Sequence, residues 1–230
     1  MGRNPVIVIK RRNCQMKRKN TATVIFAALV SVCMMLTTLG GCTGEVAPDV
    51  SSESSEVESV TGRQDGERFE AVIQLEGMDE TVHYEHVRNE TAGFEIDYDY
   101  EQLERRGEPD HEQFVSRFDN PEKPDNYIEV TLKSENVDAV SAAIKGELAE
   151  QYKNVSMDEQ YTLESAGSCV QISASQARKN KAPKDSLQTV YIIPAAKGSL
   201  VVKVHCTIES AEGFGARFTN IVNTLTVIGK

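Results

Sequence analysis

The sequence predicts an α+β domain in which an antiparallel sheet of about six to eight strands packs with two main amphipathic helices. In most segments after residue 68, apolar residues alternate with polar ones, which is the period of a half-buried strand. Two segments instead repeat apolar residues at helical spacing. The strands come in runs without regular alternation with helices, and this pattern favours α+β over a parallel α/β sheet.

Residues 1–41 have the three parts of a secretory signal peptide. Lys17, Arg18 and Lys19 supply positive charge, an apolar run of 13 residues covers 24–36, and small residues follow. The apolar run is shorter than the ~20 residues that a membrane-spanning helix needs. Because this signal is complete from Met16 onward, we expect translation to begin at Met16.

The tetrad Leu39, Gly40, Gly41 and Cys42 closes the signal and resembles the lipobox of bacterial lipoproteins. The resemblance implies that the chain is cleaved before Cys42 and that this cysteine carries a diacylglycerol with palmitate-type chains. The mature protein would then be extracytoplasmic and anchored to the cell membrane. An ordinary signal peptide with an incidental cysteine, or a signal anchor, is the alternative.

Removal of the signal would leave a strongly acidic chain. All seven Lys and Arg residues before Cys42 would be lost and no Asp or Glu, so 18 basic and 35 acidic residues give a formal charge of −17. Such a charge disfavours nucleic acid as a partner. The partners that we expect are the membrane, through the lipid, and another envelope protein or polymer.

Residues 43–67 are predicted to be a tether. They contain seven acids, one base, five serines and no aromatic residue, and such a composition cannot bury enough apolar surface to offset the entropy lost on ordering. We therefore assign 42–67 to the lipidated cysteine and a disordered acidic tether, and 68–230 to a single domain.

The first half of this domain predicts four strands. Alternating residues mark strands at 69–75 and 82–84, with a turn at 76–80 between them, and further strands at 94–98 and 128–132. Residues 100–106 predict a short helix, and 107–126 a loop that presents contacts.

The second half predicts the two main helices and a meander. Asn136 is placed to cap a helix with one apolar stripe, formed by Val137, Val140, Ile144, Leu148 and Tyr152. Ser210 is placed to cap another, with Glu212 in its first turn and an apolar face of Phe214, Phe218, Ile221, Val222 and Leu225. Strands at about 168–175, 187–193 and 200–208 form an antiparallel meander between them.

This order of elements resembles that of PsbP-like domains over about 80–230, from "GFEIDYDYEQL" and "NYIEVTLKS" through "TVYIIPAAKGSLVVKVHC" to "SAEGFGARFTNIVNTLTV". The resemblance implies an α/β/α sandwich. It says little about function, because one fold hosts unrelated sites.

Two cysteines, Cys169 and Cys206, fall within the domain. The meander places them opposite positions six residues apart on the middle strand, ~20 Å at 3.3 Å per residue, whereas a disulfide needs Cα atoms within ~7 Å. We therefore expect buried thiols outside a disulfide. His205 and Cys206 should face opposite sides of the sheet, so we expect no catalytic dyad.

Histidines and carboxylates are the remaining candidate ligands. His83 and His86 should lie on opposite faces of a strand, which favours surface or half-buried histidines over a zinc site. Acids cluster in 97–112, and Ca²⁺ takes six to eight oxygen ligands, so the candidate metal ligands are Asp97, Asp99, Glu101 and Asp110. The alternative is a solvated acidic face, since the spacing is not that of an EF-hand.

One basic cluster, in the loop 176–186, is a candidate contact for envelope phosphates or an acidic partner: Arg178, Lys179, Lys181 and Lys184. The alternative is a hairpin loop that its charge keeps solvated. The chain contains no GxSxG, SxxK or HExxH string and no CxxC pair. We therefore expect a non-catalytic binding module of the envelope, and the alternative is an envelope-acting enzyme or calcium-dependent protein that uses the carboxylates of 97–112.

Overall fold

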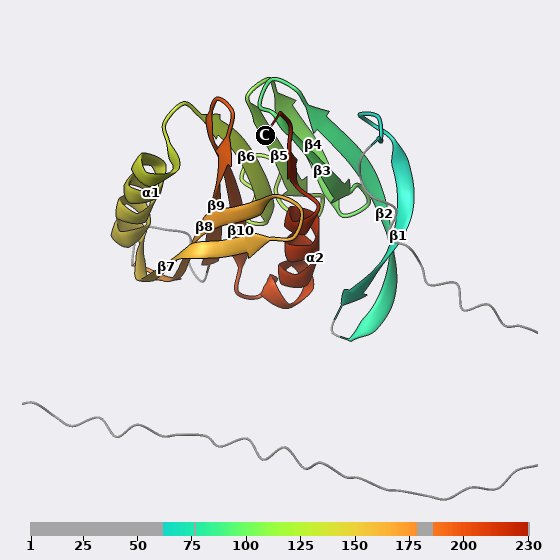
Figure 1. The fold of residues 1–230 in the computed structure, drawn as a ribbon. Coiled ribbons are helices and arrows are strands. Elements are labelled where there is room, and N and C mark those ends of the chain that lie inside the picture. Colours follow the sequence, from blue (N-terminus) through green and yellow to red (C-terminus); the bar gives the residue numbers. More distant parts are fainter. Residues whose placement is uncertain (1–61, 76, 179–185, 230) are drawn as a thin grey trace, which may run out of the picture. The chain divides into compact units, whose positions relative to one another are not determined.

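Residues 62–75, 77–178 and 186–229 are described by the computed structural model, and they contain two antiparallel sheets and two helices (Figure 1). The smaller sheet has the strand order β1-β2-β3-β11. Its strands are β1 (Arg68–Leu75), β2 (Met78–Asn89), β3 (Phe94–Asp99) and β11 (Thr226–Val227).

The larger sheet has the order β4-β5-β6-β10-β9-β8-β7. Its strands are β4 (Leu103–Glu108), β5 (His111–Ser116), β6 (Tyr127–Lys133), β7 (Tyr152–Leu163), β8 (Gly167–Ala177), β9 (Ser186–Ala195) and β10 (Gly198–Thr207). The α+β class and the meander β8–β9–β10 are confirmed. The expected single sheet of about six to eight strands is wrong, because the described residues form eleven strands in two sheets.

The two helices, α1 (Val137–Gln151) and α2 (Ala211–Asn223), cover opposite faces of the larger sheet. One core cluster joins Val140 and Leu148 of α1 to Ile172 and Ile192 of the meander. The meander residues that point to the other face of the larger sheet pack with α2 and the smaller sheet in a second cluster. In Figure 1 the meander strands therefore lie between α1, at the left, and α2.

Both helix starts were predicted, but only the first is capped as expected. The side chain of Asn136 accepts a hydrogen bond from the Ala139 N–H at 2.9 Å, which satisfies one of the free donors of the first turn. Ser210 occupies the N-cap position of α2 but caps no N–H with its side chain. Its hydroxyl donates to Asn126 and also contacts the Thr207 hydroxyl, so it ties the helix to β10 and the loop before β6.

Two expectations for the first half of the domain are corrected. Residues 100–106 do not form a helix: β4 begins at Leu103 and pairs with β5 in a hairpin, although 107–126 was expected to be a loop. The helix propensity of Glu104, Arg105 and Arg106 is overridden by strand pairing with β5. The buried side chains of Leu103 and Phe114 pack the hairpin against the core.

The strand β7 was also missed, and it contains a bulge that positions part of the site described below. The β7–β8 register shifts between Asp158 and Tyr161, so the face that each residue presents changes there. Val155 and Met157, before the shift, pack on the α1 side, whereas Tyr161, after it, packs in the other cluster.

Residues 62–67 were assigned to the tether, but the structure packs them against the smaller sheet. The Gly66 N–H donates to the His86 carbonyl, and the His86 N–H donates to the Glu67 carbonyl, both at 2.8 Å. The Arg63 guanidinium lies 3.8 Å from the centre of the Phe69 ring. Residues 62–67 therefore belong to the folded domain, and the rest of the predicted tether lies outside the described residues.

Candidate functional site

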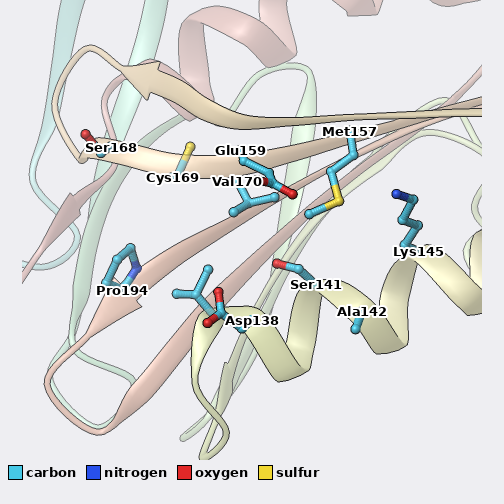
Figure 2. A pocket seen from close by; sticks show the side chains of 11 residues that line it. Asp138, Ser141, Ala142, Lys145, Met157, Glu159, Ser168, Cys169, Val170 and Pro194 are labelled. Atoms are coloured by element: carbon cyan, nitrogen blue, oxygen red, sulfur yellow. The ribbon is translucent and has the colours of Figure 1, made fainter.

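An open cavity of about 630 Å³ lies between the first half of α1 and the strands β7, β8 and β9 (Figure 2). We call it the α1 groove. Its lining residues are Val137, Asp138, Ser141, Ala142, Lys145, Met157, Glu159, Ser168, Cys169, Val170 and Pro194. Its volume falls within the ~300–1,000 Å³ of small-molecule sites, which combine apolar walls with a few polar groups.

Ser141 is the unusual residue of this groove. This residue is 2 % exposed, and its hydroxyl has no hydrogen-bond partner among the described residues. A serine inside a helix can donate a hydrogen bond from its hydroxyl to the carbonyl four residues earlier. A buried hydroxyl that is left unpaired costs ~1–3 kcal/mol. In Figure 2 the oxygen points from the helix toward the strands, so a polar group entering the groove would meet it.

Three charged side chains border the groove: Asp138 and Lys145 on α1, and Glu159 on β7. None of the three forms an ion pair or hydrogen bond with another residue in the described ranges. Glu159 lies within the bulge, between the last residue that pairs in the first register and Tyr161, which resumes pairing. In Figure 2 its carboxylate lies over Val170, between the helix and the strand.

The two domain cysteines are buried and outside a disulfide, as predicted. Cys206 pairs with Leu187, whereas Val170, which follows Cys169, pairs with Ile192 further along β9. Burial raises the pKa of the Cys206 thiol, which opposes a reactive thiolate. Cys169 lines the α1 groove, but in Figure 2 its sulfur points away from α1.

His205 and Cys206 face opposite sides of the sheet, as predicted. Nδ1 of His205 donates a hydrogen bond to the Asp125 carbonyl (2.7 Å), and the ring stacks on Tyr127, whereas Cys206 belongs to the core cluster. Burial lowers the pKa of His205, which favours the neutral imidazole. On β2, His83 is half-buried as expected, but His86 is completely buried, which corrects the expectation of a surface or half-buried side chain.

The candidate calcium ligands are not brought together. Asp97 is 2 % exposed and its carboxylate lies 2.6 Å from Nδ1 of His86, while Asp99 is 3 % exposed and forms an ion pair with Arg217 at 3.0 Å. Burial raises the pKa of both carboxyl groups. A solvated acidic face is therefore wrong for these two residues, because α2 and β2 supply their partners.

The other two candidates lie elsewhere. Glu101 is exposed and lies 3.3 Å from Nδ1 of His83, and Asp110 is exposed in the β4–β5 turn. Glu112 of the same segment is buried in a bidentate hydrogen-bonded pair with Arg105. Within residues 62–229 as far as they are described, no group of three or more His, Cys, Asp or Glu side chains is placed to hold a metal ion.

Of the predicted basic cluster, the structure describes Arg178, whereas Lys179, Lys181 and Lys184 lie outside the described residues. Nε of Arg178 donates to the carbonyls of Ala149 (3.2 Å) and Tyr152 (3.0 Å) at the end of α1. A cation there satisfies free carbonyls and complements the helix dipole. Arg178 thus has a structural role, and its contact with a partner stays a prediction.

The predicted lipobox of Leu39, Gly40, Gly41 and Cys42 also lies outside the described residues. Neither α1 nor α2, the helices in the described ranges, is long and apolar enough to span a membrane. The chain matches none of the models of known protein families, and no curated protein is significantly similar to it in sequence.

Sequence reasoning missed the α1 groove, although one signal for it was present. Ser141 lies on the same side of the helix as Val137, Val140 and Ile144, so a hydroxyl interrupts the predicted apolar stripe. Glu159 could not be placed in the groove because that placement depends on the bulge in β7.

Proposed function

We propose that this protein is an extracytoplasmic lipoprotein, anchored to the cell membrane through Cys42, whose folded domain is a non-catalytic binding module of the cell envelope. The observation that carries the binding function is the α1 groove, where apolar walls surround a buried hydroxyl that no described residue pairs with. The anchoring rests on the signal and lipobox pattern of residues 16–42. Residue 62, the first that the structure describes, follows Cys42 by 20 positions in the sequence.

The finer fold that we propose is PsbP-like. It is supported by the antiparallel meander, which has α1 against one face and α2 against the other. The second sheet, β1-β2-β3-β11, lies on the α2 side and would be an elaboration of that arrangement.

The enzyme alternative, based on the carboxylates of 97–112, has less support. A general acid or base has to reach its substrate, but Asp97 and Asp99 are almost completely buried. Glu112 accepts two hydrogen bonds from Arg105 and is buried in this structural pair. We therefore keep binding as the proposed function and place no calcium site in it.

Fractionation of cells that express the full chain tests the anchoring. We expect the wild type in the membrane fraction, resistant to extraction with high salt. Cys42→Ser should abolish cleavage before residue 42 and lipid attachment, whereas Cys169→Ser, a matched replacement within the domain, should fractionate as the wild type does. A Cys42→Ser protein that is processed and retained like the wild type would overturn the proposed anchor.

A further inference from the structure

We propose that the α1 groove binds an amphipathic cation, meaning an ammonium group carried on an apolar body. This inference rests on the proposed binding function and names the class of ligand. Three features of the groove carry it: the apolar walls, the unpaired hydroxyl of Ser141 and an excess of acidic over basic side chains at the rim.

The walls select the apolar body. Val170 is buried in the floor, Met157 and Val137 are half-buried beside it, and Pro194 and Ala142 extend the apolar surface toward solvent. Each methylene group that such walls remove from water contributes ~0.8 kcal/mol. A purely hydrophilic cation would leave this surface without a partner.

The rim selects the sign of the charge. The groove is lined by two carboxylates, Asp138 and Glu159, and one ammonium, Lys145, and no other described residue neutralises the two acids. The mature chain also has a formal charge of −17, which raises the local concentration of cations over that of anions. Electrostatic complementarity of this kind determines selectivity more than it determines affinity.

The position of Lys145 indicates where the ammonium group lies. Lys145 follows Asp138 by seven residues, about 10 Å along a helix that rises 1.5 Å per residue, and Figure 2 shows the two side chains at opposite ends of the groove. The ammonium group of the ligand therefore lies at the end formed by Asp138, away from Lys145. Ser141 lies between them, one turn from each.

The hydroxyl of Ser141 completes the site for this head group. A serine oxygen can accept a hydrogen bond from an ammonium N–H. In the free protein this oxygen has no hydrogen-bond partner among the described residues, so the ligand would supply a bond that the fold itself does not. A carboxylate ligand could also bond to the hydroxyl, but it would be repelled by Asp138 and Glu159.

Three probes with one apolar body test the inference: n-hexylammonium, hexanol and hexanoate, titrated at pH 7 into the mature chain with Cys42→Ser. Amide chemical shifts of Ala142 and Val170 report binding in the groove. Because each exposed ion pair adds ~0.2–1 kcal/mol, we expect hexylammonium to bind about fivefold more tightly than hexanol, and hexanoate to bind least tightly. Replacing both acids, by Asp138→Asn and Glu159→Gln, should remove the preference, and Lys145→Gln should increase it.

Ser141→Ala separates binding from folding. It removes an unpaired buried hydroxyl and substitutes a better helix former, so the melting temperature should rise. The affinity for hexylammonium should nevertheless fall about threefold or more, as expected for one lost hydrogen bond. A hydroxyl with a purely structural role would leave the affinity unchanged, which would contradict its part in the site.

The outcomes distinguish the two proposals. If hexanoate binds as tightly as hexylammonium, the cation selectivity is refuted while ligand binding in the groove stands. If none of the three probes shifts the groove amides at millimolar concentration, the groove is not a small-molecule site, and both the inference and the binding function assigned to this groove fail.

Discussion

At the scale of single residues, burial turns several acidic side chains from a predicted surface feature into part of the core. Asp97 was predicted to lie on the opposite face of β3 from Ile96 and Tyr98, and it does. The residues that cover this face were not predicted. The cover comes from His86 on the neighbouring strand and from Arg63, which lies 3.9 Å away in the segment before β1. Contacts between residues so distant in sequence leave no local pattern.

Asp97 predicts a pH dependence of stability. Burial raises its pKa in the folded chain, against the lowering effects of His86 and Arg63, so the folded state binds this proton more tightly than the unfolded state does. The stability that the group contributes is therefore complete below the unfolded pKa of about 4 and is lost as the pH rises through the folded value.

Asp97→Asn removes this titration while keeping the shape of the side chain. We expect the urea midpoint for unfolding of Asp97→Asn to rise relative to that of the wild type as the pH is raised from 4 to 7. Asp110→Asn, a replacement of an exposed carboxylate, should show no such trend. Parallel pH profiles for Asp97→Asn and the wild type would show that the charge of Asp97 is fully compensated in the folded state.

At the scale of elements, the strands and helices with an uninterrupted period were predictable, and those shaped by pairing were not. The helix α1 follows from Asn136 and its apolar stripe, and the meander follows from strict alternation. Residues 104–107 of β4 show no alternation of apolar and polar side chains. They form a strand because they pair with β5 in a hairpin. In β7 the alternation was present, but the bulge changes which face the residues occupy.

The same distinction can be measured with two glycines. Gly146 lies in α1 with open space where a Cβ would be, so Gly146→Ala should raise the free energy of unfolding by about 1 kcal/mol. Gly198, the first residue of β10, has φ +131°, and a Cβ there would lie 2.0 Å from the Lys133 carbonyl oxygen. Gly198→Ala should therefore destabilise the protein strongly.

Chemical denaturation of both glycine variants provides the measurement. The difference in sign between them is the critical result, because the substitution is the same and only the element differs. A neutral Gly198→Ala would mean that the β10–β6 pairing is looser at this point than the register from Ser199 to His205 indicates.

At the scale of the whole molecule, the described part of the chain, from residue 62 onward, is organised around the larger sheet. The larger sheet separates two cores, and the α1 groove opens on the core that α1 shares with the meander. The smaller sheet and α2 occupy the other side. Cys169 belongs to both regions, because it lines the groove and also packs in the larger core, which contains Cys206 as well.

The anchor is expected from the charge, apolar length and lipobox of residues outside the described part of the chain, and it stays a prediction. The fold class could be predicted at this scale because it depends on a local pattern, the alternation of apolar and polar residues in the strands. The groove could not, because its walls come from α1, β7, β8 and β9 together. The ligand class follows only once Ser141, Asp138 and Glu159 are seen to share one cavity.

The intact mass and N-terminal peptide of the mature protein, extracted from membranes with detergent, test the central claim most directly. We predict a chain that begins at Cys42, heavier than residues 42–230 by the mass of a thioether-linked diacylglycerol. A mature chain that begins at another residue, or an unmodified Cys42, would contradict the account of a lipid-anchored binding module.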